Sequence, residues 1–350
     1  MNVKPTRENV KYIGRAFEYD GNAILGFSGS GIEFVTGDET ITINIAGDET
    51  AEKTEKLYDR ARLAIYVNDE RKYDFMVSSP SLSYDLRCGD GDMIRVIKLS
   101  ENAMSSAAVT EIISDKGIKP AEDKKLLVEI IGDSITCGYG VDDEMLGHVF
   151  STMTEDCTKS YSLKTVRKLD ADGELCSLSG WGIISGYSDD GETRHTEQLI
   201  PSVYERCGYS VSKFFGFNPQ EYEWDFKGRR RPDITVINLG TNDASYCLDH
   251  KDRQDMYSAE YASFLETVRK HRPGTPILCI LGVMGETLCP ALQKAVDIYK
   301  EKTGDSNIYT KMFKDQLEED GRVIDYHPTV VTHEKVSEIL KATISEILGL

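Results

Sequence analysis

The chain has 350 residues, 40% of them hydrophobic and 29% charged, and its 59 acidic residues outnumber 41 basic ones to give a formal net charge of -18. This composition is typical of a globular protein, and the length favours two domains over a single core. The acidic balance disfavours a nucleic-acid partner, because phosphate backbones carry charge of the same sign.

Neither a membrane helix nor a signal peptide is visible in the sequence. No stretch reaches the roughly 18 apolar residues that a membrane helix needs, and residues 1–6 lack the apolar core of a signal peptide. We therefore expect no membrane partner and a cytoplasmic protein, unless a leader has been removed. The eight cysteines show no Cys-x-x-Cys spacing, which predicts free thiols in a reducing compartment and no metal site.

The first third of the chain reads as β-structure. Short segments of alternating polarity recur between turn signals such as Gly37-Asp38 and Asn68-Asp69. Strands are expected at residues 23–27, 31–35, 39–45, 61–67, 73–77, 92–99 and 109–113. This regular pattern predicts a β-sandwich over residues 1–118, followed by a polar linker with Pro120 over residues 119–124.

The rest of the chain, residues 125–350, alternates strands with helices. Strands are expected at residues 126–131, 175–178, 234–239, 277–283 and 308–310, and helices at residues 161–169, 256–269, 291–302 and 333–348. The alternation predicts an α/β fold with a parallel sheet between two helical layers, in which sites form beyond the carboxyl ends of the strands.

A long insertion, residues 184–232, is rich in Gly, Tyr and charge and is expected to form a wall or lid. Its basic run, residues 227–231, is interpreted as the solvated edge of a loop in preference to a phosphate site. The insertion therefore adds no motif of its own to the candidate chemistry.

The first candidate site residue is Ser134, in the stretch Gly132-Asp133-Ser134 after an apolar strand. Gly132 ends the strand, and Ser134 lies on a turn near a helix N-terminus, where backbone N–H groups favour negative charge. The pattern indicates a nucleophilic serine, with a plain turn as the alternative.

Two further strands end in glycine and polar residues. Asn242, in Gly240-Thr241-Asn242-Asp243, offers an amide that could hold an oxyanion, or else belongs to a common Asn-Asp turn. In Gly180-Trp181-Gly182 a glycine would let a backbone N–H approach a ligand, and we favour Gly182 over Gly180.

The last candidate block is Asp325-Tyr326-His327-Pro328, just before the final helix. His327 could be a general base. Asp325, two residues away, can point the same way in an extended segment and accept the imidazole N–H. The five other histidines are expected to be surface or structural residues, and His333, at the start of a helix, is expected to be structural.

Together these blocks resemble the SGNH, or GDSL, hydrolase superfamily. The residues that carry the resemblance, in the superfamily's order, are Gly132-Asp133-Ser134, Gly182, Gly240-x-Asn242-Asp243 and Asp325-x-His327-Pro328. The Asp-x-His spacing departs from the usual Asp-x-x-His. With the preceding β-domain it is similar to carbohydrate esterase family 2, which implies an N-terminal jelly roll joined to a flavodoxin-like three-layer SGNH domain.

The resemblance implies removal of acetyl groups from sugar hydroxyls by acyl transfer through Ser134, with His327 as base and no cofactor or metal. It implies an oxyanion hole made by the Ser134 N–H, the Gly182 N–H and the Asn242 side chain. Some family members rely on a Ser-His dyad, so the orienting role of Asp325 stays open. The expected partner is a small-molecule or oligosaccharide ester.

Two alternatives stay open: a lipase-like or thioesterase acylhydrolase of the same superfamily, and a non-catalytic carbohydrate-binding protein. On the substrate side, Trp181 could stack on a sugar or pack in the core, and Tyr139 could form a wall of the site. Because the β-domain has no tryptophan, we expect it to be a fixed structural partner in preference to an independent binding module.

Overall fold

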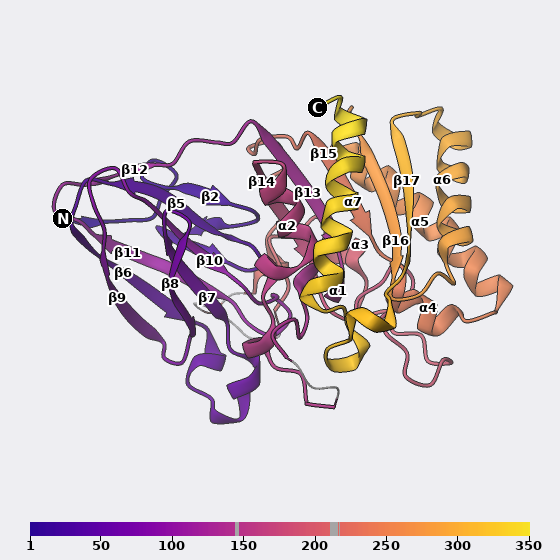
Figure 1. The fold of residues 1–350 in the computed structure, drawn as a ribbon, viewed down its shortest axis with the longest axis horizontal. Helices are drawn as coiled ribbons and strands as arrows, with labels where there is room; N and C mark the ends of the chain where they lie inside the picture. The colour runs from indigo at the N-terminus through magenta and orange to yellow at the C-terminus, as the bar shows by residue number, and fades with distance from the viewer. Residues whose placement is uncertain (144–146, 211–215, 217) are drawn as a thin grey trace.

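The structure is a computed structural model, and it describes residues 1–143, 147–210, 216 and 218–350. Figure 1 shows two units side by side, an N-terminal pair of β-sheets and a C-terminal sheet flanked by helices. Within the described residues no helix combines the length and the apolar character needed to cross a membrane.

The N-terminal unit is a sandwich of two antiparallel sheets. One sheet has the order β3 (Phe17–Tyr19), β4 (Asn22–Leu25), β11 (Ala107–Ile113), β6 (Thr40–Gly47) and β9 (Ser81–Arg87), with β1 (Asn2–Val3) paired to β11. The other has the order β12 (Ile118–Pro120), β5 (Gly31–Thr36), β10 (Met93–Lys98), β7 (Arg62–Val67) and β8 (Glu70–Met76), with β2 (Lys11–Ile13) paired to β5. This architecture confirms the predicted sandwich.

The core between these sheets forms because apolar side chains alternate with polar ones along the strands, and the apolar ones point inward. In β6, Ile41, Ile43 and Ile45 are buried, and the residues between them are at most half-buried. Strand β9 escaped prediction because its outward-facing residues are polar and its inward face is only partly covered. Strand β12 pairs with β5 although it lies partly in the expected linker; the domain limits at 118 and 125 stay predictions.

The C-terminal unit contains a five-stranded parallel sheet, as predicted. Its order is β14 (Ala171–Ser177), β13 (Leu126–Gly132), β15 (Ile234–Asn238), β16 (Ile277–Val283) and β17 (Ile308–Asp315). The longer helices are α2 (Tyr161–Lys168), α5 (Lys251–His271), α6 (Cys289–Thr303) and α7 (Val330–Leu348), and the short ones are α1 (Ser134–Cys137), α3 (Ile200–Val203) and α4 (Thr241–Cys247).

Successive residues of the central strand face opposite helical layers. Ile130 packs in the core formed with α2 and α7, and Ile131 packs in the core formed with α5 and α6 (Figure 1). A strand covered on both faces must be apolar throughout, which explains the continuous hydrophobic run of β13.

Buried contacts fasten the two units together. Phe27 and Ala103 of the sandwich lie in the same hydrophobic core as Leu178 and Trp181. Arg15 of the sandwich is fully buried and donates to the Tyr204 carbonyl at 2.6 Å. The sandwich and the α/β unit therefore share buried contacts, and the role of the sandwich as a fixed structural partner stays a prediction.

Arg15 also joins a buried ionic cluster. It lies 3.4 Å from Glu129, which Arg272 binds through two bonds of 2.9 and 2.6 Å. Burial alone would raise the pKa of Glu129, but Arg272 and Arg15 hold it at about 2. The Glu129 charge therefore depends on both guanidinium groups.

We predict that Arg15→Leu destabilises the protein by about 3–5 kcal/mol, because removing one partner leaves buried charge unpaired. The measurement is equilibrium unfolding in urea. Lys53→Ala, which breaks an ion pair with Glu49 whose side chains are 47% and 46% exposed, should leave the midpoint nearly unchanged. Equal midpoints for the two variants would contradict the prediction.

Candidate active site

The candidate residues gather at the carboxyl edge of the parallel sheet. Ser134 follows β13, Gly180 follows β14, Asn242 follows β15, and His327 lies between β17 and α7. Strand β13 is flanked by β14 on one side and β15 on the other, so the chain reverses its direction of winding there. Such a switch point leaves a crevice beyond the strand ends.

Ser134 is the first residue of α1 and is held by its neighbour. The Asp133 side chain caps the helix by accepting the Ile135 N–H at 3.0 Å. As the first helical residue, Ser134 has no intrahelical acceptor for its own N–H. The Ser134 Oγ lies 2.8 Å from Nε2 of His327, although 193 residues separate the two in sequence.

The other imidazole nitrogen, Nδ1 of His327, faces two backbone carbonyls. It lies 3.3 Å from the oxygen of Ile324 and 3.2 Å from the backbone oxygen of Asp325. The Asp325 carboxylate instead accepts a 2.7 Å hydrogen bond from the Tyr139 hydroxyl. The expectation that this carboxylate accepts the imidazole N–H is therefore wrong.

The reason is the backbone of this segment. Ile324–Tyr326 forms a tight 3₁₀ turn, with φ of +49° at Asp325 and +61° at Tyr326. The argument that residues two apart point the same way holds only for extended chain. In this turn the backbone carbonyl of Asp325, and not its side chain, reaches the imidazole.

The surroundings keep the imidazole uncharged. Burial lowers the pKa of His327 from its ordinary 6.5 to about 4, so the ring is a neutral proton acceptor at neutral pH. Tyr139 stacks on the ring at 4.3 Å between centroids. His333 is structural as expected: it is 1% exposed, and its Nδ1 accepts the Tyr161 N–H at 3.1 Å.

The glycine that offers a free N–H is Gly180 and not Gly182. The Gly182 N–H donates to the Gln198 carbonyl at 3.1 Å, within a short bridge between Gly182 and Leu199. Among the described residues the Gly180 N–H has no acceptor. Gly180 has φ of +81° and faces open space, since a Cβ there would meet nothing within 4 Å.

The preference for Gly182 is thus corrected to Gly180. Both glycines follow the same strand, and sequence spacing gave no way to see that the bridge to Leu199 would use the Gly182 N–H. Gly180 is the glycine nearer to the strand end, and it alone of the two has the left-handed backbone that favours glycine.

Asn242 and Asp243 brace the loop that carries Gly180. The Asn242 amide donates one N–H to the Trp181 carbonyl at 2.9 Å and carries a second N–H. The buried Asp243 carboxylate accepts the N–H groups of Ile183, Ile184 and Ser185 at 2.9, 2.7 and 3.1 Å. The sequence motif contained Asp243, but its bracing role was not anticipated.

The two aromatic candidates have different positions. The Trp181 indole is 3% exposed and packs edge-on against Tyr209 at 4.8 Å, so it is a core residue and not an open platform for a sugar. This corrects its expected substrate-binding role. Tyr139 is half-buried between His327 and Phe150, whose ring stacks on it at 4.0 Å. Its role as a substrate wall stays a prediction.

The insertion of residues 184–232 lies partly outside the described residues, at 211–215 and 217. In its basic run, Arg229 donates to the Ala16 carbonyl, Arg230 to the Lys124 carbonyl, and Arg231 to the Pro273 carbonyl. These arginines tie a loop edge to neighbouring backbone, which agrees with the reading that the run is not a phosphate site.

Comparison with known proteins adds the family. The model of the GDSL-like Lipase/Acylhydrolase family matches residues 130–337. The chain is 31% identical over 235 residues to Cellulase/esterase CelE of Acetivibrio thermocellus, a match that covers 66% of this chain and 26% of the relative. This chain thus spans only about a quarter of that relative's length.

Solved structures show the same fold over the whole chain. An acetyl xylan esterase, Est2A, from the rumen bacterium Butyrivibrio proteoclasticus has 20% identity and a TM-score of 0.86, covering 100% of this chain and 98% of that one. A family two carbohydrate esterase from Clostridium thermocellum, in complex with cellohexaose, has 24% identity and a TM-score of 0.81, covering 97% and 99%.

These matches confirm the resemblance drawn from the four sequence blocks and the expected fold class, a jelly-roll sandwich joined to a flavodoxin-like SGNH domain. The chain belongs to the GDSL-like lipase/acylhydrolase family.

Proposed function

We propose that this protein is a serine esterase that removes acetyl groups from O-acetylated carbohydrates. The observation that carries the proposal is the 2.8 Å contact between Ser134 Oγ and His327 Nε2; the free N–H of Gly180 follows β14, the strand next to the one that precedes Ser134. The names of similar proteins, Cellulase/esterase and acetyl xylan esterase, support an ester of a carbohydrate as substrate.

The reaction proceeds in two acyl-transfer steps. His327 Nε2 takes the hydroxyl proton as Ser134 Oγ attacks the ester carbonyl, and the imidazolium then gives that proton to the sugar oxygen as its bond to the acetyl carbon breaks. This leaves acetyl-Ser134. Water, deprotonated by the same imidazole, attacks the acetyl carbonyl; as the bond to Ser134 Oγ breaks, the imidazolium returns a proton to that oxygen, and acetate leaves.

The negative charge of each tetrahedral intermediate falls on one oxygen. We assign its stabilisation to the N–H of Ser134, the N–H of Gly180 and the second N–H of the Asn242 amide, because backbone N–H groups and asparagine side chains are the usual oxyanion donors in acyl transfer. The bond from Asn242 to the Trp181 carbonyl ties the Asn242 amide to the residue that follows Gly180.

The imidazole needs no carboxylate in this proposal. The carbonyls of Ile324 and Asp325 accept from Nδ1 and so fix the tautomer that leaves Nε2 free to take a proton. Tyr139 stacks on the ring and binds the Asp325 carboxylate, which holds the turn in place. The catalytic pair is therefore a dyad supported by backbone.

Ser134→Ala should lower turnover of acetylated xylo- or mannooligosaccharides by at least about 10³-fold, because the nucleophile is lost. Acetate release and p-nitrophenyl acetate hydrolysis are the measurements, with Ser83→Ala on the exposed face of β9 as the matched control. Preference for a long-chain p-nitrophenyl ester would favour a lipase-like acylhydrolase instead. Absence of turnover in the wild type would leave a binding protein.

Asp325→Asn should keep kcat within about tenfold of the wild type, whereas the same change in a Ser-His-Asp triad costs about 10⁴-fold. The reason is that asparagine tolerates the left-handed backbone and its side-chain oxygen can still accept from Tyr139. Steady-state kinetics of this variant beside His327→Ala make the comparison. A loss near 10⁴-fold in a folded Asp325→Asn protein would restore the carboxylate as the orienting group.

The pH profile should show an acid limb near pH 4. A general base works only when neutral, and since burial places the pKa of His327 at about 4, activity is present above that pH and is lost as pH falls through it. The measurement is kcat/KM for p-nitrophenyl acetate against pH. A limb near the ordinary imidazole value of 6.5 would refute the burial argument.

A further inference from the structure

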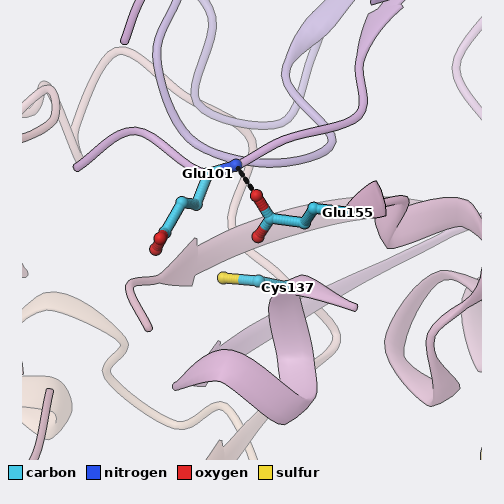
Figure 2. Close-up of side chains that lie close together, drawn as sticks. All are labelled: Glu101, Cys137 and Glu155. Carbon is cyan, nitrogen blue, oxygen red and sulfur yellow. Dashed lines mark hydrogen bonds between the residues drawn. The ribbon is translucent and has the colours of Figure 1, made fainter. Parts of the chain in front are cut away.

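A loop of the sandwich reaches the back of the proposed oxyanion hole. It follows β10 and carries Glu101 and Asn102, both fully buried. Figure 2 shows the Glu101 and Glu155 carboxyl groups and the Cys137 thiol converging on one another. Cys137 lies on α1, three positions after Ser134, so the cluster lies directly behind the nucleophile helix.

Glu101 binds the segment that presents Gly180. One oxygen of its carboxylate, Oε2, accepts the N–H of Ser179 at 2.6 Å, and Ser179 immediately precedes Gly180. A bond from an amide to a carboxylate is charge-assisted and stronger than a neutral one. The bond fixes the peptide group between Leu178 and Ser179. Only the φ and ψ angles of Ser179 lie between that peptide group and the one that carries the Gly180 N–H.

Glu101 is itself held on both sides. Its N–H donates to the Glu155 carboxylate at 2.9 Å, the bond drawn in Figure 2. Its carbonyl accepts from the Lys98 ammonium at 2.6 Å, and Lys98 is fully buried. The backbone of Glu101 is therefore anchored at both its N–H and its carbonyl, and its side chain is fully buried.

The next residue holds the other side of Gly180. The Asn102 side-chain oxygen accepts the Tyr209 N–H at 2.7 Å, and the Tyr209 ring packs against Trp181. Two consecutive sandwich residues thus brace Ser179 before Gly180 and Trp181 after it. Neither residue belongs to the parallel sheet or to any of the motifs noted in the sequence.

We propose that Glu101 is a positioning residue of the esterase: its carboxylate fixes the Ser179 amide and thereby aims the Gly180 N–H at the substrate oxyanion. The inference rests on the proposed function and assigns the sandwich a part in it. Glu101 does not touch the substrate, and it acts through Ser179 and Gly180.

The charges in the cluster fit this role. Burial raises the pKa of Glu101 and that of Glu155, and the positive charge of Lys98 opposes the rise at both groups. Each carboxyl has one oxygen, Oε1, without a partner among the described residues. The Ser179 N–H bond uses the other oxygen of Glu101, Oε2, which keeps this carboxyl group directed at the segment before Gly180.

The same three side chains are of types that bind Zn²⁺, with ligand atoms within 4.8 Å of one another. The positioning role is favoured because the Oε2 oxygens of Glu101 and Glu155 already accept backbone N–H groups, and because Lys98 supplies positive charge. Zn²⁺ dependence is therefore an outcome that the experiment must distinguish.

The test compares Glu101→Met, which keeps the length of the side chain without a carboxylate, with Glu101→Gln, whose carbonyl can still accept from Ser179. Asp48→Leu and Asp48→Asn are the matched controls. Asp48 is also a buried carboxylate that accepts backbone N–H groups, from Thr50 and Ser106 at 2.9 and 2.6 Å, but these lie within the sandwich.

Glu101→Met should lower kcat for p-nitrophenyl acetate by about 10- to 100-fold with little change in KM, since small misplacement of a transition-state donor acts on kcat. Glu101→Gln should recover most of the loss, and both Asp48 variants should retain wild-type kcat. Wild-type kcat in a folded Glu101→Met protein would overturn the proposal. So would activity that EDTA removes and Zn²⁺ restores.

Amide hydrogen exchange gives a readout that does not need turnover. Exchange at the Ser179 amide, whose N–H Glu101 accepts, should speed up in Glu101→Met, and to a lesser degree in Glu101→Gln, which serves alone if the Met variant does not fold. The Asp48 variants should leave the Ser179 amide protected as in the wild type. Exchange rates that do not change in the Glu101 variants would refute the positioning role. If the variants change exchange as expected but the wild-type protein shows no esterase activity, only the proposed function is refuted.

Discussion

The contact between Ser134 Oγ and His327 Nε2 is the constraint on which the site depends. The two residues are 193 positions apart, and their 2.8 Å separation requires that the strand before Ser134 and the turn before α7 end at one edge of the sheet. The parallel order of β14, β13, β15, β16 and β17 satisfies this requirement, because every strand then points its carboxyl end toward the same crevice. The hydrophobic layers on both faces of β13 keep that edge rigid.

Many of the groups that surround this contact and hold it in place belong to the backbone. Carbonyls of a strained turn face the imidazole, a left-handed glycine presents a free N–H, and the Asp243 carboxylate gathers three amides of the loop that follows. The sandwich adds a second layer of support through Arg15 and Glu101, both buried against the α/β unit. The two units therefore form one framework around the proposed site.

Sequence reasoning identified the parts of the site that are marked by chemistry and by strand endings. Ser134, Asn242 and His327 each follow an apolar strand or precede a helix, and the structure brings Ser134 and His327 together. The sequence could not show that Gly180, and not Gly182, has the free N–H. That choice depends on the bridge between Gly182 and Leu199, which no local sequence pattern predicts.

Asp325 and Trp181 were misassigned for a related reason. The Asp325 expectation assumed extended backbone, and the chain instead takes positive φ there. Trp181 follows a strand like a site residue, but its ring turns into the core against Tyr209. The role of Glu101 could not be predicted from the sequence because its partner, Ser179, belongs to the other unit of the chain. The Trp181 and Glu101 misses depend on tertiary contacts, and the Asp325 miss depends on the local backbone conformation.

The most direct test of the central claim is to trap the acyl-enzyme. The protein is mixed with p-nitrophenyl acetate, quenched in acid and digested, and its peptides are weighed by mass spectrometry. The proposal predicts the mass of one acetyl group on the peptide that contains Ser134, and none on that peptide in Ser134→Ala. Turnover with the acetyl group on another side chain, or with no acetylated peptide at all, would contradict it.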